Sequence, residues 1–313
     1  MEVSDSVISR GFVTIATGRE EYYILAHNLL MSYRFHSRSQ VPFAVICDKE
    51  NEYTADFDKV VLMDNPKYSV FDKLRLPELA PYDETIFIEA DCLVYADLNG
   101  MWDLFKDGPD FGGLGIPVSL DDERGWIRPE FLGKFTGLVK EQCLHQGGVY
   151  FMRKGNLKDF MLTCEDIYLH LDDFHFGLPN EEPIIILACM VHGYKPVMDW
   201  FDVFCYYPVC AITMIDILDG VLEFNQKPNG PNSRPGIFLV HWGTKYTREK
   251  LYQREAQAVV SQMRLRGLAK LAAFCAYKVK LLNYNSLKRK IPLPVKTFVW
   301  KILVLFNRSL RQS

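Results

Sequence analysis

The stretch ETIFIEADCLVY, residues 84–95, places two carboxylates inside an apolar run. Glu89 and Asp91 follow the segment 86–88 and precede the segment 92–94, and both segments are typical of a buried β-strand. An ionised carboxylate that is buried without a partner is strongly destabilising. Because residues two apart on a strand point to the same side, we expect both carboxylates to face one spot that also holds a positive partner.

Strand-like and helix-like segments alternate around this stretch. Short runs rich in β-branched residues predict strands, the apolar spacing after the first run predicts an amphipathic helix, and a helical turn comes next. This alternation predicts an α/β fold with a mostly parallel, Rossmann-like central sheet and flanking helices, in which ligands bind at the carboxyl ends of the strands. The expected strands are 11–18, 41–48 and 58–64, with the stretch 84–95 as the fourth; the helix is 19–37 and the helical turn is 70–79.

The pattern is looser after residue 97, but strands and helices still alternate. Two polar segments rich in glycine, proline, asparagine or aspartate predict loops. We expect strands at 109–117, 146–155 and 237–243, helices at 156–171 and 180–194, aromatic-rich strands within 195–208, and loops at 118–142 and 225–236.

The charge is divided unevenly along the chain. Sixteen of the 36 Lys and Arg residues, but only two of the 39 Asp and Glu residues, lie at or after Lys245. The net charge of −3 therefore combines an acidic body with a strongly basic end. Such a division suggests that the basic end has an anionic partner of its own.

This basic end has a helical pattern. Residues 249–283 interleave apolar and basic side chains, and residues 286–311 repeat the mixture around a proline break. We therefore divide the chain into a catalytic domain, 1–247, and a basic amphipathic helical tail, 248–313, which we expect to lie on an anionic membrane surface. Two alternatives stay open: a helix packed on the body, and a nucleic-acid-binding patch, although no recognition motif is present.

The N-terminal sequence MEVSDSVISR is acidic and polar and lacks the pattern of a signal peptide. No apolar run approaches the ~18 residues of a membrane span. The eight cysteines are scattered without a metal-binding or disulfide spacing. We therefore expect a cytoplasmic protein in a reducing compartment, associated with the membrane only at its surface.

Two carboxylates at the end of a central strand favour a divalent cation. Hard oxygen ligands suit Mn²⁺ or Mg²⁺, which would in turn bridge the oxygens of a substrate diphosphate. Such a cation would be the positive partner that Glu89 and Asp91 require. The alternative is a pair of acids exposed at a strand end.

The segment YDETIFIEADCLVYADL, residues 82–98, resembles the Asp-x-Asp region of nucleotide-sugar glycosyltransferases with the GT-A fold. It is most similar to family 8, which includes glycogenin and bacterial lipopolysaccharide galactosyltransferases. Further resemblances occur in the same order as in the family and extend over roughly residues 11–245. They are TIATGREEYYILAHNLLMSYR (14–34), FDKLRL (71–76), HQGGVYFMRKG (145–155), PNEEPI (179–184) and LVHWGTK (239–245).

The resemblance implies a role for each matching residue. Glu89, Asp91 and His241 would hold the metal, and a neutral imidazole beside two carboxylates is a suitable third ligand for Mn²⁺. Taken alone, a histidine that ends an apolar strand is more often structural. The remaining implied residues are Lys73, or Arg75 as second choice, with Gly243 and Lys245 at the donor phosphates; Ala16, Thr17 and Tyr22 around the base; Gln146 and Gly148 beside the sugar; and Glu181 and Glu182 at the sugar or acceptor.

The chain departs from the family pattern at several of these positions. Glu89 replaces the first Asp of the motif, Gln146 replaces an Asn, and Glu181 and Glu182 replace an Asp-Gln pair. Gly243 also follows the histidine sooner than in the family. Glu181 and Glu182 are in addition the kind of acids that stabilise a helix N-terminus. These departures leave the donor sugar and the stereochemistry open.

The implied reaction is transfer of a sugar from a nucleotide diphosphate, such as a UDP-sugar, to a hydroxyl of a glycan or lipid-linked acceptor, with retention of configuration. Inversion would require a carboxylate base, for which the candidates are Glu181, Glu182, Asp172 and Asp173. Two other classes stay open. One is a sugar-nucleotide nucleotidyltransferase, and the other is a catalytically idle nucleotide-sugar-binding or scaffold protein of the same fold.

Overall fold

A central sheet of six strands runs through the computed structural model, which describes residues 8–38, 41–155, 157–176, 180–197, 203–226 and 238–286. The first four strands of the chain are parallel to one another, and the last two form an antiparallel pair at one edge. This arrangement confirms the predicted α/β fold with a mostly parallel sheet. The strand order is β3 (Lys59–Leu62), β2 (Phe43–Cys47), β1 (Arg10–Ala16), β4 (Glu84–Ile88), β7 (Glu141–Arg153) and β6 (Phe111–Ser119).

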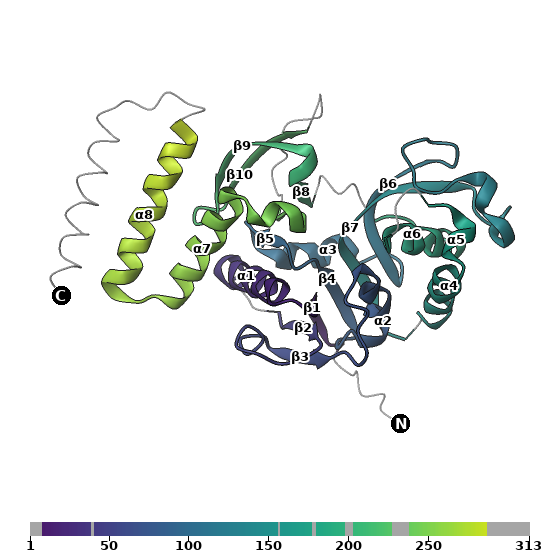
Figure 1. Ribbon diagram of the computed structural model, residues 1–313, viewed down its shortest axis with the longest axis horizontal. Coiled ribbons are helices and arrows are strands. Elements are labelled where there is room, and N and C mark those ends of the chain that lie inside the picture. Colours follow the sequence, from purple (N-terminus) through teal and green to yellow (C-terminus); the bar gives the residue numbers. More distant parts are fainter. Residues whose placement is uncertain are drawn as a thin grey trace.

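Helices cover both faces of this sheet (Figure 1). Alternate residues of each strand point to opposite faces, so Phe12 and Ile86 lie in one hydrophobic core while Val13 and Phe87 lie in the other. The first core is covered by α1 (Glu20–His36), α3 (Met101–Phe105) and α7 (Lys250–Arg264), and the second by α2 (Leu76–Leu79), α4 (Lys158–Leu169) and α6 (Glu182–Val191).

The stretch 84–95 forms two strands, not the single strand that we predicted. β4 ends at Ile88, and β5 (Cys92–Val94) belongs to a separate sheet of the order β5, β11 (Leu239–His241) and β8 (Phe204–Tyr206). The amide of Glu89 still donates to the carbonyl of Gly148 on β7, at 3.0 Å, before the chain leaves the central sheet. Glu89 and Asp91 therefore lie in the turn between two sheets.

The other elements are short or lie outside these sheets. A hairpin of β9 (Cys210–Asp216) and β10 (Val221–Gln226), which the sequence pattern did not predict, follows β8. Most of the expected loop 225–236 lies outside the described residues. The rest are α5 (Leu171–Phe174) and the 3-10 helices η1 (Val70–Arg75), η2 (Leu98–Gly100), η3 (Pro129–Phe131), η4 (Gly133–Phe135), η6 (Tyr207–Val209) and η7 (Thr244–Arg248).

The helix α7 packs on the body of the protein. Tyr252 is fully buried, its ring lies 5.5 Å from the ring of Trp242, and its hydroxyl accepts a hydrogen bond from Asn28 of α1. Val259 is buried in the same core. The core of the expected catalytic domain thus continues past residue 247, although the division into two domains stays a prediction.

Beyond α7 the chain turns back into α8 (Gly267–Ser286), which lies alongside α7 in Figure 1. The second part of the expected tail, residues 287–313, lies outside the described residues. Within the part of the chain that the structure describes, no helix combines the length and the apolar character needed to cross a membrane.

Candidate active site

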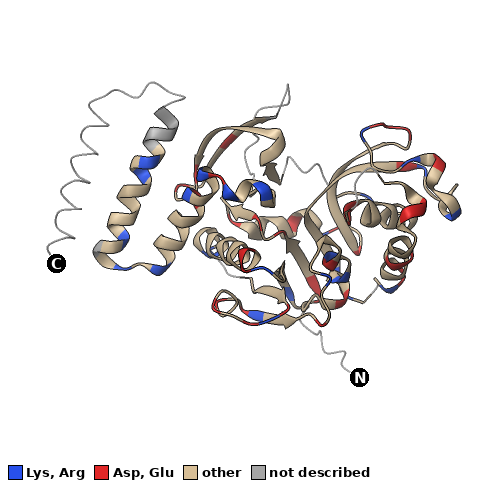
Figure 2. Ribbon diagram, viewed as in Figure 1, with Lys and Arg blue, Asp and Glu red and all other residues tan. Residues whose placement is uncertain are grey.

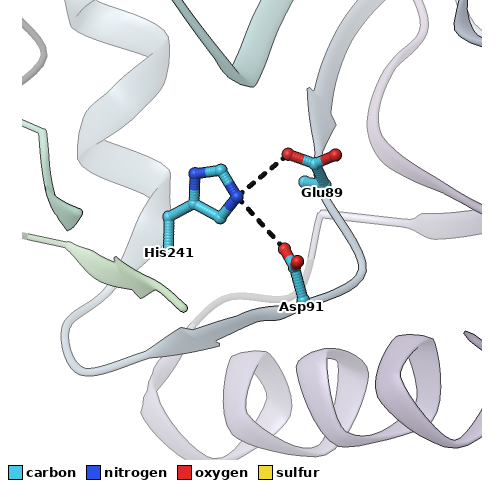
Figure 3. A group of neighbouring side chains, drawn as sticks. All are labelled: Glu89, Asp91 and His241. Carbon is cyan, nitrogen blue, oxygen red and sulfur yellow. Dashed lines mark ion pairs between the residues drawn. The ribbon is translucent and has the colours of Figure 1, made fainter. Parts of the chain in front are cut away.

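Glu89, Asp91 and His241 come together as a compact cluster (Figure 3). Nε2 of His241 lies 3.0 Å from Oε2 of Glu89 and 3.2 Å from Oδ1 of Asp91. The two acids come from the turn after β4, and the histidine comes from the end of β11. The structure therefore brings together the three residues that the sequence implied as metal ligands.

Neighbouring elements fix the three side chains. His241 of β11 pairs with Cys92 of β5, so the histidine lies next to the turn that carries the acids. The backbone amide of Trp242 also donates to the carbonyl of Asp91, at 3.3 Å. Gly148 of β7 leaves room for the imidazole, because a Cβ at this position would lie 2.8 Å from Nδ1 of His241.

Lys73 of η1 neutralises the other side of the cluster. Its ammonium donates to Oε1 of Glu89 at 2.6 Å and also forms an ion pair with Glu181. The side chain of Lys73 is almost buried, and that of Glu181 is buried. In the protein alone, the positive partners of Glu89 are thus Lys73 and His241.

The pKa values of these groups follow from burial and charge. Burial alone would lower the pKa of His241, but Asp91 and Glu89 beside it raise the pKa to about 10. Burial opposes the ionisation of Glu89, yet Lys73 and His241 hold the pKa of Glu89 below its ordinary value. In the same way, Glu89 and Glu181 outweigh the effect of burial and raise the pKa of Lys73.

The cluster fits a divalent cation. Two carboxylates and an imidazole suit Mn²⁺, and their ligand atoms all lie within 4.8 Å of one another. Adjacent ligands of an octahedral cation are roughly 3 Å apart, since each bond is about 2.1 Å long. Oδ1 of Asp91 is buried, and its neighbour is the imidazole of His241 at 3.2 Å, so a cation in the cluster would take the place of the proton that the two side chains share.

Glu182, the first residue of α6, contacts the backbone of β7. Its Oε1 accepts a hydrogen bond from the amide of Gly147 at 2.6 Å. Burial first, and then the charge of Glu181, raise the pKa of Glu182 to about 7. The pKa of Glu181 is also raised, by burial, although Lys73 opposes the shift. Gln146, which was predicted to lie beside the sugar, directly precedes Gly147 on β7 and is buried.

A pocket opens beside the cluster and contains the residues expected around the nucleotide. Thr17 and Tyr22 line it together with Lys73, Glu89 and Asp91. Ala16, which we also expected there, is buried at the end of β1, directly before Thr17. The lining of the pocket therefore combines aromatic residues with charged residues of the cluster.

Two predicted cations lie elsewhere. Arg75 donates to the carbonyl oxygen of Asp64 at 2.6 Å and pairs with Glu78, so of the two candidates in η1 it is Lys73 that faces the cluster. Lys245 is exposed on η7, with its ammonium 5.7 Å from the ring centroid of Tyr246. Gly243 has a φ of 73° and turns the chain from β11 into η7.

Three site residues were missed at the level of sequence. Thr244 lines the pocket and donates to Oδ2 of Asp91 at 3.1 Å. Asp72 lines the pocket, is buried and accepts a hydrogen bond from Thr17 at 3.1 Å. Tyr68 lines the pocket with a positive φ of 53°. Thr244 and Asp72 adjoin predicted site residues, whereas nothing in the sequence pattern indicates Tyr68.

Comparison with solved structures identifies the fold. The galactosyltransferase LgtC, crystallised in complex with donor and acceptor sugar analogs, superposes with a TM-score of 0.51 at 13% identity, covering 82% of this chain and 97% of that chain. An active-site mutant of LgtC gives 0.49 at 14% identity over the same shares of 82% and 97%. The apo bifunctional glycosyltransferase WbbM gives 0.45 at 15% identity, covering 76% of this chain and 46% of that chain.

The likeness to LgtC at a TM-score of 0.51 shows that the chain has the GT-A fold, as the sequence resemblance implied. No protein-family model and no curated protein matches the chain at the level of sequence.

Proposed function

We propose that the protein is a metal-dependent glycosyltransferase that moves a sugar from a nucleotide diphosphate, such as a UDP-sugar, to a hydroxyl of a glycan or lipid-linked acceptor. The observation that carries this proposal is the cluster of Glu89, Asp91 and His241 beside a pocket at the carboxyl end of the central strands. The GT-A fold supports it, and LgtC of the same fold was crystallised with donor and acceptor sugar analogs.

The roles of the residues follow from their positions. Glu89, Asp91 and His241 would hold Mn²⁺ or Mg²⁺, and such a cation neutralises the charge that develops on a departing diphosphate. Lys73 adds a fixed positive charge on the same side, which strengthens electrostatic stabilisation of that leaving group. Thr17 and Tyr22 bind the nucleoside end of the donor. Ala16, Gly243 and Lys245 stay expected contacts of the donor.

Glu182 is able to exchange a proton near neutral pH. A carboxyl group with a pKa of about 7 exists in both protonation states there, so it is able to donate a hydrogen bond to the sugar or to accept one from it. Glu181, Gln146 and Gly148 complete this side of the site. We propose retention of configuration; inversion would need one of the two glutamates as the base for the acceptor hydroxyl.

Asp91→Asn tests the central assignment. The substitution keeps the size of the side chain but removes a charged ligand, so we expect sugar transfer and Mn²⁺-dependent UDP binding to fall at least ~100-fold, with an unchanged circular dichroism spectrum. Calorimetry with UDP and Mn²⁺, and hydrolysis of a panel of nucleotide sugars, measure the two effects. Asp103→Asn, which removes an exposed acid of α3, is the matched control and leaves both activities at the wild-type level. Wild-type activity of Asp91→Asn would remove the proposal.

We further propose that the hairpin of α7 and α8 contacts an anionic membrane at the cytoplasmic side. Several apolar side chains are exposed around the end of α7 and the start of α8, and α8 carries only basic charges, shown in blue in Figure 2. Apolar and basic side chains together favour binding to an interface of acidic lipids. The exposed apolar residues are Met263, Leu265, Leu271 and Phe274.

A further inference from the structure

Tyr68 adopts a backbone conformation that tyrosine rarely occupies. Its φ is 53°, in the left-handed region that favours glycine, and its side chain is 62% exposed. A bulky residue in this region is strained, and an exposed aromatic ring gains little from packing. Neither feature stabilises the fold, so the position of Tyr68 needs another explanation.

The surroundings hold Tyr68 in this conformation. The amide of Lys67 donates to Oδ1 of Asp72 at 2.7 Å, and the ammonium of Lys67 lies 3.5 Å from the ring centroid of Tyr168 on α4. The amide of Asp72 donates to the carbonyl of Ser69 at 3.0 Å. The residues on both sides of Tyr68 are therefore anchored, and the strain persists because these contacts over-determine the loop.

The ring of Tyr68 lies over the pocket. It lines the pocket with Tyr22 and Leu25, and it packs against Gly18, where a Cβ would lie 2.9 Å from Cδ1 of the ring. Gly18 itself has a φ of 78°. Tyr22 is fixed from the other side, since Arg19 lies over its ring at 4.9 Å and donates to its hydroxyl. Part of the pocket lining is thus aromatic and apolar.

The same pocket is also lined by the charged groups of Lys73, Glu89 and Asp91. A ligand that satisfies both the aromatic and the charged lining has a planar, weakly polar ring joined to an anionic group. We propose that Tyr68 stacks on the planar base of the nucleotide donor, which makes Tyr68 the base-stacking residue of the site. This inference rests on the proposed function and adds to it the residue that recognises the base.

Base stacking on an aromatic ring accepts any base, because every base presents a π-face. Tyr68 therefore provides affinity for a nucleoside diphosphate over inorganic pyrophosphate, without selecting among bases. The phenolic hydroxyl is not required, so phenylalanine is expected to replace tyrosine.

The test measures binding by calorimetry to the full chain with Mn²⁺, using UDP, CDP, GDP, ADP and inorganic pyrophosphate as probes. Tyr68→Gly removes the ring and relieves the strain, Tyr68→Phe keeps the ring, and Asn65→Gly is the matched control. Asn65 has a φ of 50° in the same loop and is exposed, outside the lining of the pocket.

We expect Tyr68→Gly to weaken binding of the tightest nucleoside diphosphate by roughly 5- to 100-fold. Its affinity for pyrophosphate stays within about twofold of the wild type, because the charged lining of the pocket is intact. Tyr68→Phe binds as the wild type does. Both glycine variants raise the thermal unfolding midpoint, because each relieves a positive φ, but Asn65→Gly leaves nucleotide binding unchanged.

The outcomes separate the inference from the proposed function. If the wild type binds a nucleoside diphosphate and Tyr68→Gly binds it equally well, the stacking role is wrong while the proposed function stands. Equal losses for the nucleotide and for pyrophosphate would also overturn the stacking role, since the ring would then act through the charged lining. Absence of nucleotide binding by the wild type with Mn²⁺ would overturn both.

Discussion

Lys73 compensates the negative charge of the buried carboxylates of the site. It lies between Glu89 and Glu181, and both acids are partly or fully withdrawn from water. A buried ion pair is weak evidence for net stabilisation, but removing one partner leaves an uncompensated charge. Lys73 therefore has a structural role before any ligand binds, in addition to its proposed role at the donor phosphates.

Lys73→Met keeps the length of the side chain and removes its charge. We expect the free energy of unfolding to fall by about 3 kcal/mol at neutral pH, because Glu181 loses its ion pair and Glu89 keeps only His241. The double variant with Glu181→Gln should recover part of this loss, since the charge of Glu181 is then removed as well. Urea denaturation in the presence of a chelator measures both values; equal stability of Lys73→Met and the wild type would contradict the role.

Glu182 should make stability depend on pH. Its pKa is raised from 4.5 to about 7 in the folded protein, so the folded state binds a proton that the unfolded state has released between these values. Stability from this group is therefore fully present below pH 4.5 and falls as the pH rises to about 7.

Glu182→Gln removes this dependence and keeps an oxygen for the amide of Gly147. We expect the variant to be more stable than the wild type by about 3 kcal/mol at about pH 8, and equally stable near the ordinary pKa of a glutamate. Urea titrations at the two pH values measure the difference. A constant difference at both pH values would show that Glu182 does not titrate as described.

The three residues of the cluster were named from the sequence, but the place of Tyr68 in the pocket was not. Glu89 and Asp91 stand out because they interrupt an apolar run, whereas His241 was implied only by the resemblance to the glycosyltransferase family. A positive φ at Tyr68 results from contacts of Lys67 and Asp72 with distant residues, which no local pattern reveals. The pairing of Lys73 with Glu181 is also a tertiary property.

The turn between β4 and β5 brings the carboxylates together. We predicted this convergence from strand alternation, which is the wrong reason, because the strand ends at Ile88 and a new strand begins at Cys92 in another sheet. An apolar run does not reveal where a chain changes sheets, since both strands are buried. The hairpin of β9 and β10 was not predicted either. Whether such a segment forms strands depends on packing against other parts of the chain, which the local pattern does not show.

β7 shows how a single strand positions two different groups. Gly147 and Gly148 are neighbours that approach different groups: a Cβ on Gly147 would lie 2.5 Å from Oε1 of Glu182, and a Cβ on Gly148 would lie 2.8 Å from Nδ1 of His241. The absence of side chains at both positions lets the strand contact both groups closely.

Gly148→Ala and Gly147→Ala form a matched pair. We expect Gly148→Ala to displace the imidazole and to weaken Mn²⁺ binding by about 10-fold or more, because the orientation of a ligand controls metal affinity. Gly147→Ala displaces Glu182 instead, so it should keep Mn²⁺ affinity and lose sugar transfer. Calorimetry with Mn²⁺ alone and a transfer assay distinguish them, and the assignment would be contradicted if both variants lost Mn²⁺ equally.

At the scale of the whole molecule, the basic end of the chain is partly built into the body. Tyr252 and Val259 of α7 are buried in the core, and Arg264 pairs with Asp56 at 3.2 Å. At the junction with α8, the hydroxyl of Tyr277 donates to Glu255 and Lys278 pairs with Asp216 at 2.6 Å. Removing everything after residue 247 would expose this core, so the membrane proposal requires substitutions at the surface.

The last prediction concerns the exposed end of the hairpin. Changing Met263, Leu265, Leu271 and Phe274 to serine should abolish binding to vesicles that contain phosphatidylserine, because these side chains are the exposed apolar contacts. Replacing Arg266 and Lys270 by glutamine should weaken binding roughly 30-fold, since each basic residue contributes ~1 kcal/mol near acidic lipids.

Flotation with vesicles of phosphatidylserine and phosphatidylcholine, against phosphatidylcholine alone, measures this binding. The control variant changes Leu138, Leu162 and Leu169 to serine. These leucines are more exposed than the hairpin residues but lie outside the hairpin, so the control should bind as the wild type does. A chain that ends at residue 286 keeps every described helix and measures what residues 287–313 add. If the hairpin variant binds acidic vesicles as well as the wild type while the shortened chain does not bind, the contact belongs to residues 287–313 and the role of the hairpin is wrong.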